Sequence, residues 1–243
     1  MVRQAILMAG GKGTRLRPIT YVTPKPLTIL GDMSIIEIIL YQLAHYGFGR
    51  VTMLLGYKPE MVKAVVGDGS KWGIDINYVQ ESDPLGTIGG LKLLADDLDE
   101  NFLVMNTDIL TILNYRRIFD YHRLGGALAT VGSVRKLETI QLGVLEVDES
   151  SRIIDYREKP IYHFLAAMGI HCFNREVLKY IPVGKPFGLD DLIFSLLEAK
   201  EKIQAFIFSG LWMDLGRPDD LERAGELFEH SKSSFLPAKA DLP

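Results

Sequence analysis

Two kinds of segment alternate along the first half of this chain, and the alternation restricts the folds open to it. Short apolar runs typical of strands lie at residues 4–8, 51–55, 76–80, 102–105 and 127–133. Between them, apolar residues recur at helical spacing at 35–46, 59–66 and 114–124. A chain that alternates strand and helix forms a mostly parallel sheet with helices on both faces. We therefore predict an α/β fold whose ligands bind beyond the carboxyl ends of the strands.

The second half of the chain is richer in strands. Runs at 144–147 and 153–156 flank a polar turn at 148–152, which predicts a hairpin, and further strands are predicted at 168–173 and 203–208 and helices at 175–180 and 219–229. No repeat or linker interrupts residues 1–230, so we predict one domain with a smaller β-rich subregion. Residues 231–243 are polar and contain proline, and we expect either a mobile tail or an oligomer contact there.

Composition narrows the class of protein. The 243 residues are 47% hydrophobic and carry a net charge of −4, with no run of Lys and Arg, so we expect no nucleic-acid partner. Cys172 is the only cysteine, which suits a reducing compartment. No apolar stretch is long enough to span a bilayer. We expect a cytoplasmic protein without a membrane partner.

A glycine-rich segment follows the first predicted strand. Gly10, Gly11 and Gly13 come directly after an apolar run, and Arg15 and Lys25 follow within the same loop system. Glycines let backbone N–H groups approach an anion without a Cβ in the way. We therefore predict a site for a polyphosphate, against the alternative of an ordinary glycine turn with solvated charges.

Two familiar phosphate loops do not fit this segment. A P-loop needs Ser or Thr after Gly-Lys, but Gly13 follows Lys12. The dinucleotide fingerprint needs a small residue where Leu16 stands and a helix that starts at once. Here Pro18 keeps the chain extended instead.

The pattern Gly-Gly-x-Gly-Thr-Arg-Leu-x-Pro-x-Thr at 10–20, with Pro-Lys-Pro-Leu at 24–27, resembles the signature of the sugar-1-phosphate nucleotidylyltransferases. The likeness extends over residues 3–229. It implies a Rossmann-like, mostly parallel mixed sheet, with the β-rich subregion binding the sugar. It also implies Mg²⁺ as cofactor, a nucleoside triphosphate (NTP) and a sugar 1-phosphate as substrates, and a nucleoside-diphosphate sugar and pyrophosphate as products. We also expect a homo-oligomer, either a dimer or a tetramer.

The resemblance assigns the metal to two acids. Asp108 follows the predicted strand at 102–105, where a carboxylate can hold Mg²⁺ beside a phosphate, although it could instead cap a helix. Asp214, in Trp-Met-Asp-Leu-Gly, matches the family's second metal ligand. The residues expected to carry the chemistry are Arg15, Lys25, Asp108, Lys159 and Asp214.

Other roles also follow from the resemblance. Glu158 would contact sugar hydroxyls, Lys159 would hold the sugar phosphate, and Gly143 and Gly169 would lie against the sugar. The nucleotide would contact Ala9, Gly10, Gly11, Gly13, Thr14, Gln80, Pro84, Gly86 and Thr87. The sequence Pro-Leu-Gly-Thr at 84–87 is most similar to the guanylyltransferase branch, which implies GTP with a hexose or heptose 1-phosphate. UTP and dTTP remain alternatives.

The chain departs from the family pattern at two places. Thr107 stands where a glycine usually precedes the first metal ligand, and Ala166-Ala167 replaces a segment whose asparagine contacts the sugar. Either the sugar differs, or Tyr162 or His163 supplies the missing polar group.

There are two competing hypotheses: a nucleotide-binding module without activity, and a transferase acting on a non-sugar phosphate such as phosphocholine. We expect His171 to be a core residue, Trp212 to be core packing, and His45, His122 and His230 to be surface or helix residues.

Overall fold

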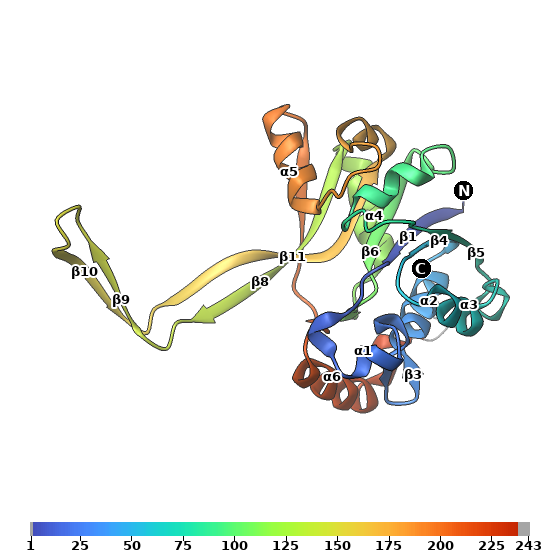
Figure 1. The fold of residues 1–243 in the computed structure, drawn as a ribbon, viewed down its shortest axis with the longest axis horizontal. Coiled ribbons are helices and arrows are strands. Elements are labelled where there is room, and N and C mark those ends of the chain that lie inside the picture. The colour runs from blue at the N-terminus through green and yellow to red at the C-terminus, as the bar shows by residue number, and fades with distance from the viewer. Residues whose placement is uncertain (1, 238–243) are drawn as a thin grey trace.

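The structure is a computed structural model that describes residues 2–237. Its centre is a seven-stranded sheet, drawn in Figure 1, whose strands follow the order β12 (Ile203–Phe208), β8 (Ala129–Thr139), β11 (Ile161–Asn174), β6 (Asn101–Asn106), β1 (Arg3–Ala9), β4 (Phe48–Leu55), β5 (Asp75–Gln80). Only β11 runs antiparallel to its two neighbours in this sheet. The predicted mixed, mostly parallel α/β sheet is confirmed.

Both faces of the sheet are buried. Along β1, Ala5, Leu7 and Ala9 belong to one hydrophobic core and Ile6 belongs to the other, because successive side chains of a strand point to opposite faces. The first core packs against α2 (Ile35–His45), α3 (Pro59–Val66), α4 (Tyr115–Gly125), α6 (Pro218–His230) and α7 (Lys232–Phe235). The second packs against α5 (Leu189–Glu198) and two 3₁₀ helices, Gly89–Leu94 and Arg175–Tyr180.

The remaining elements are short. They are the helix α1 (Ile19–Val22), the 3₁₀ helices Thr14–Leu16, Lys25–Leu27 and Ser70–Trp72, and three two-stranded ribbons: β2 (Ile29–Leu30) with β3 (Met33–Ser34), β7 (Ile109–Thr111) with β13 (Trp212–Asp214), and β9 (Gly143–Val147) with β10 (Ile153–Glu158). No helix among residues 2–237 is long and apolar enough to cross a membrane.

The second half differs from the prediction in several elements. Residues 175–180 form a 3₁₀ helix, and α5 was not predicted. Leu192 and Leu196 face the core while Phe194 and Leu197 are exposed, so apolar residues on both sides of α5 hide its helical period. Strands β8 and β11 are much longer than predicted, and together they carry the predicted hairpin β9–β10 away from the sheet (Figure 1).

The first part of the predicted tail lies against the domain. Residues 231–237 pack on the domain: Phe235 is fully buried against Phe228, and its carbonyl accepts a 2.9 Å hydrogen bond from Gln42 Nε2. A buried aromatic ring anchors this segment to α2 and α6. Residues 238–243 lie outside the described residues.

Two buried histidines lie in or beside the central sheet. His171 stacks on Phe173, as the core prediction requires, and burial lowers its pKa to about 4. His122 lies on α4 as expected but is buried, and its ring nitrogens lie 2.7 Å from Thr130 Oγ1 and 3.1 Å from Asn101 Oδ1. Burial lowers its pKa to about 4 as well. Both rings are therefore neutral in the folded protein near neutral pH.

This burial predicts acid sensitivity. The unfolded chain binds protons on these histidines below about pH 6.5, whereas the folded chain resists protonation down to about pH 4. Their contribution to stability is complete above pH 6.5 and is lost as pH falls through this window, at about 1.4 kcal/mol per pH unit for each histidine. We expect His171→Leu to flatten the fall in melting temperature from pH 7 to pH 4.5, measured by circular dichroism. The same change at exposed His230 should leave the slope unchanged.

Candidate active site

A pocket of about 410 Å³ opens at the carboxyl ends of β1 and β6. Parallel strands present their carboxyl ends at one edge of a sheet, which is where ligands of such folds bind. The predicted site residues that line it are Ala9, Gly10, Gly11, Gly13, Thr14, Arg15, Lys25, Pro84, Gly86, Thr87 and Asp108. Sequence positions up to about a hundred residues apart thus meet in one cavity.

The glycine loop is held in a conformation that few residues adopt. Gly13 has φ +59°, and its carbonyl accepts hydrogen bonds from Leu16 N at 3.0 Å and Thr20 Oγ1 at 2.8 Å. The buried Thr20 thereby anchors the loop to α1. Gly10 lies so close to Gly56 that a Cβ on Gly56 would meet the Gly10 carbonyl at 2.6 Å. The loop backbone is therefore braced from both sides.

This geometry predicts that Gly13→Ala weakens nucleotide binding. A left-handed backbone costs a non-glycine residue about 1–2 kcal/mol, and the new methyl group would lie 2.8 Å from Thr20 Cγ2. Displacing the loop should weaken NTP binding about tenfold or more by calorimetry. Gly126→Ala is the matched control, since Gly126 has φ +58° but open space around its Cβ position. It should lose similar stability and keep its affinity; equal affinity losses in both variants would contradict the loop's role.

Lysine and two carboxylates meet beside the glycine loop. Lys25 Nζ lies 2.5 Å from Asp108 Oδ2, with the two side chains only 12% and 22% exposed. Asp214 is brought alongside because β13 pairs with β7, so that Asp214 lies opposite Ile109 and Leu215 N donates to the Asp108 carbonyl at 2.8 Å. The short β7–β13 ribbon thus joins two acids that are far apart in the sequence.

Arginine completes this charged cluster. A methyl group placed on Gly216 would lie 2.9 Å from Asp214 Oδ2 and 3.2 Å from Arg15 Nη1, so both groups flank that glycine. The pKa of Asp214 is raised, first by partial burial and then by repulsion from the Asp108 carboxylate, while Lys25 and Arg15 oppose the shift. The cluster brings two neighbouring carboxylates and two cations together beside the pocket, although Asp214 does not itself line it.

The donor set fits a magnesium ion. Two carboxylates that repel one another offer oxygen ligands, and Mg²⁺ in proteins is held by one or two carboxylates together with water and substrate phosphates. No cluster of three or more acidic, histidine or cysteine ligands exists among residues 2–237. Asp108 and Asp214 would therefore hold the ion only in part, with a phosphate supplying further oxygens.

Thr107, which stands where the family pattern has a glycine, has a structural role. Its side chain is buried, and Oγ1 donates to the Met8 carbonyl at 3.1 Å, which ties the end of β6 to the end of β1. The neighbouring Asp108 is thereby positioned at the pocket. The threonine is thus compatible with the carboxylate arrangement.

The segment after β5 forms a second wall of the pocket. Gly86 has φ +76°, and a Cβ there would meet the Phe187 carbonyl at 2.7 Å. Phe187 N donates to the Leu85 carbonyl, and its own carbonyl accepts from Ile88 N and Gly89 N. Gln80, predicted to contact the nucleotide, ends β5 and does not line the pocket.

Several lining residues were missed by the sequence analysis. Glu81 lines the pocket beside Gly10, and burial raises its pKa against a backbone hydrogen bond from Leu85. Asn106 and Gly216 also line it. Each of these three residues lies in or beside a segment that the sequence analysis singled out. The sequence around them does not indicate which residues line the pocket.

Three predicted sugar-site residues lie elsewhere. Gly143 begins β9, Glu158 ends β10 and Lys159 follows it, so all three belong to the projecting hairpin, and none of them lines the pocket (Figure 1). In this structure Lys159 therefore lies apart from the Asp108 cluster, and its predicted role at the sugar phosphate stays a prediction. The reason is the unbroken ladder from Val134↔Ala166 to Thr139↔Ile161, which carries the hairpin outward.

Of the other residues predicted on the sugar side, Gly169 lies near the pocket wall, whereas Tyr162 and His163 lie on the projecting strand. Gly169 adopts φ +72° at a register break in β11, and a Cβ there would lie 3.0 Å from Asn106 Nδ2 of the pocket wall. Tyr162 and His163 are exposed on the projecting strand and do not replace the missing asparagine in this chain's own pocket. Trp212 packs on the first core and donates from Nε1 to the Met168 carbonyl at 2.9 Å.

Comparison with known proteins identifies the family. The nucleotidyl transferase family model matches residues 4–231. Mannose-1-phosphate guanylyltransferase of Mycobacterium tuberculosis is 34% identical over 90% of this chain and 62% of its own length. The Saccharomyces cerevisiae mannose-1-phosphate guanyltransferase is 31% identical over 97% of this chain and 67% of its own length. The chain thus spans about two thirds of these relatives.

Solved structures share the fold. A Bacillus anthracis protein provisionally named glucose-1-phosphate thymidylyltransferase, solved with sucrose, has a TM-score of 0.74 at 25% identity and covers 93% of this chain and 94% of its own. HddC from Yersinia pseudotuberculosis has a TM-score of 0.73 at 22% identity, over 93% of this chain and 99% of its own. These structures show the fold, and the match to the family model shows that this chain belongs to the nucleotidyl transferase family.

Proposed function

We propose that the protein transfers a nucleoside monophosphate from a nucleoside triphosphate to a sugar 1-phosphate and releases pyrophosphate. One observation carries the proposal: Arg15, Lys25, Asp108 and Asp214 meet beside a glycine loop at the carboxyl end of the central strand. The relatives named mannose-1-phosphate guanylyltransferase support the same reaction class. A hexose or heptose 1-phosphate is the proposed acceptor.

The reaction needs alignment and charge neutralisation more than acid–base chemistry. An oxygen of the sugar phosphate, already ionised, attacks the α-phosphorus; the new P–O bond forms as the bond from the α-phosphorus to the bridging oxygen breaks, and pyrophosphate leaves with that electron pair. The glycine-loop N–H groups orient the triphosphate, and Lys25 and Arg15 offset the charge that builds up. Magnesium, held by Asp108 and Asp214 when bound, would polarise phosphate oxygens.

GTP is the proposed donor. The guanylyltransferase relatives support it, and the pocket wall offers the Glu81 carboxylate, a suitable acceptor for the N–H donors of guanine. The likeness to the thymidylyltransferase-named structure favours dTTP as a second candidate.

A matrix of donors and acceptors tests the proposal. Purified protein with MgCl₂ is mixed with GTP, UTP, dTTP, CTP or ATP and with mannose, glucose or heptose 1-phosphate, or phosphocholine, and pyrophosphate release is followed. We expect the highest rate with GTP and a sugar 1-phosphate, and a loss of rate with EDTA. Release with phosphocholine alone would move the acceptor outside the sugars, and no release with any pair would support a binding module without activity.

A further inference from the structure

The most unusual part of the molecule is the arm, residues 135–167, which comprises the outer halves of β8 and β11 and the hairpin β9–β10. No residue of the arm is buried. Figure 1 shows it extending from one side of the sheet without contact to the helices that cover the body. A two-stranded ribbon alone is marginally stable in water. The arm therefore needs a surface that this chain by itself does not provide.

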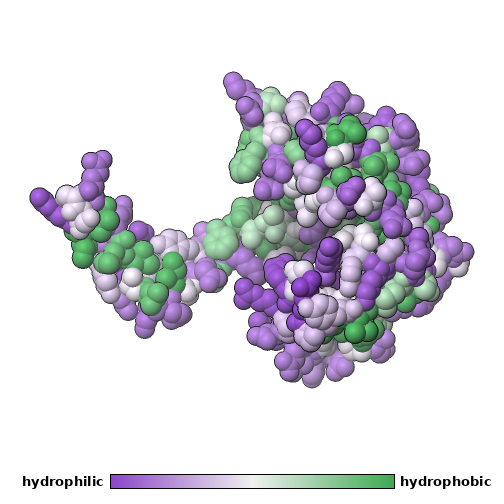
Figure 2. Space-filling model, viewed as in Figure 1, coloured by the Kyte–Doolittle hydropathy of each residue, from purple (hydrophilic) through white to green (hydrophobic). Residues whose placement is uncertain are grey.

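One face of the hairpin is apolar. Leu145 lies opposite Tyr156 and Val147 opposite Ile153, and directly opposite residues share a face. All four are more than half exposed. Figure 2 shows this apolar surface on the arm, remote from the body of the molecule. A face of this kind marks an interaction site rather than solvent-facing surface.

The opposite face of the hairpin is charged. Arg157 lies 3.7 Å from Glu146 and 3.1 Å from Asp155, and these residues alternate with the apolar ones along the strands. The hairpin is thus built with one face for water and one face for a partner. Gly143 and Glu158 pair with one another on the apolar face, and the Tyr156 hydroxyl donates to Glu158.

The pocket and the arm tip complement one another in charge. Arg15 and Lys25 are the only basic side chains among the lining residues, and Lys25 is paired with Asp108. A second phosphorylated substrate beside a triphosphate adds negative charge, which another cation would offset. Lys159 stands at the end of the apolar face, next to Glu158, with its side chain exposed. The arm tip therefore carries the groups that the pocket lacks.

The outer ladder of the arm is continuous and holds the arm away from its own pocket. Its ladder runs without a register shift from Val134↔Ala166 to Thr139↔Ile161, and the break in β11 lies nearer the sheet, between Ala167 and His171. Closure onto the same subunit would require the arm to bend at that break, away from the ladder course seen here. Exchange of arms between two copies about a twofold axis leaves it intact and covers both apolar faces at once.

We propose that this chain forms a dimer with exchanged arms, in which Glu158 and Lys159 of each subunit bind the sugar 1-phosphate in the pocket of the other. The arrangement rests on the proposed transferase function for the roles of these two residues. The dimer itself rests on the arm's exposed apolar face and unbroken ladder.

Subunit complementation tests the exchange. Asp108→Asn damages the pocket and leaves the arm intact, whereas Lys159→Ala damages the arm tip and leaves the pocket intact. Each variant alone should be nearly inactive. The two are co-expressed with different affinity tags and the hybrid dimer is purified through both. In an exchanged dimer, one site combines the pocket of the Lys159→Ala subunit with the arm of the Asp108→Asn subunit, and this site carries neither lesion. The hybrid should therefore regain about half of the wild-type activity.

The controls separate the possible outcomes. A hybrid of Asp108→Asn with Lys25→Met carries two pocket lesions and should remain inactive. An inactive hybrid of Asp108→Asn with Lys159→Ala, beside an active wild type, would show that each site is built within one subunit and would overturn the exchange while leaving the proposed function in place.

Molecular mass tests the dimer without any activity. By light scattering we expect the wild type to be a dimer. Replacing residues 140–160 with an Asn-Gly turn, which rejoins Thr139 to Ile161 across an existing pair, should give a monomer that keeps the melting transition of the body. A monomeric wild type, or a dimer that survives removal of the hairpin, would overturn the proposal. A dimer that is inactive with every substrate pair would overturn only the proposed function.

Discussion

Asp108→Asn should lower turnover about 100-fold or more while the fold survives. The carboxylate stands at the end of β6, 22% exposed, paired with Lys25 and close to Asp214. Asparagine keeps the shape and removes the charge, so the site loses the proposed metal ligand and the counter-charge of Lys25 together. Steady-state pyrophosphate release, with circular dichroism as the check on folding, measures the effect.

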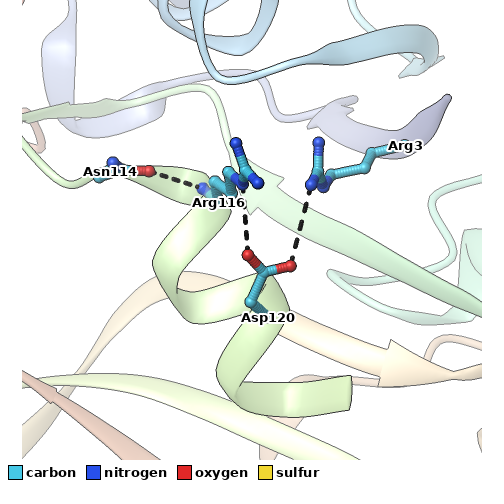
Figure 3. Close-up of polar contacts among 4 residues, drawn as sticks. All are labelled: Arg3, Asn114, Arg116 and Asp120. Atoms are coloured by element: carbon cyan, nitrogen blue, oxygen red, sulfur yellow. Dashed lines mark hydrogen bonds and ion pairs between the residues drawn. The ribbon is translucent and has the colours of Figure 1, made fainter. Parts of the chain in front are cut away.

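Asp120→Asn is the matched control for that loss. Asp120 lies on α4 between Arg3, 3.9 Å away, and Arg116, 3.3 Å away, and Asn114 caps the same helix by accepting from Arg116 N at 3.0 Å (Figure 3). Because Arg3 begins β1, this cluster lies at the opposite edge of the sheet from the pocket. The control should keep full turnover. Full activity in Asp108→Asn, with no need for metal, would contradict the role assigned to that carboxylate.

Lys25→Met should have a comparable effect through a different cause. Its ammonium group is the least exposed cation of the pocket and offsets both the substrate charge and the two carboxylates. Without it, Asp108 and Asp214 repel one another with only Arg15 nearby, and the triphosphate meets an acidic pocket. We expect kcat/KM to fall by about 10²–10³, and the dependence on magnesium concentration to shift upward.

A lysine–carboxylate pair outside the pocket provides the comparison for Lys25. Lys71 Nζ lies 2.7 Å from Glu37 Oε1 at the surface, and exposed pairs of this kind contribute little, about 0–1 kcal/mol. Lys71→Met should therefore leave both kcat/KM and the magnesium dependence unchanged. Similar losses in the two variants would show that the effect at Lys25 is a general consequence of removing charge.

Much of the fold could be predicted because its pattern is local. Strand β1 is a short continuous apolar run, and helices α2 and α3 repeat apolar residues at helical spacing, so their positions follow from the order of apolar residues. The positions of the glycine loop and Asp108 could also be predicted, because both follow strands that end at one edge of a parallel sheet. Helix α5 was missed because apolar residues on its exposed side hide the helical period.

What the amino-acid order determined by itself was the parallel sheet, the edge at which the pocket opens and the residue types expected to meet a polyphosphate there. Only the tertiary structure decided which distant segments meet. It brought Asp214 to Asp108 through the β7–β13 ribbon and carried Lys159 away on the arm. The physical reason is that strand pairing joins residues across any sequence distance, and that a ladder extends as far as its register holds. Neither the approach of Asp214 to Asp108 nor the length of the arm therefore leaves a periodic pattern in a short stretch of sequence.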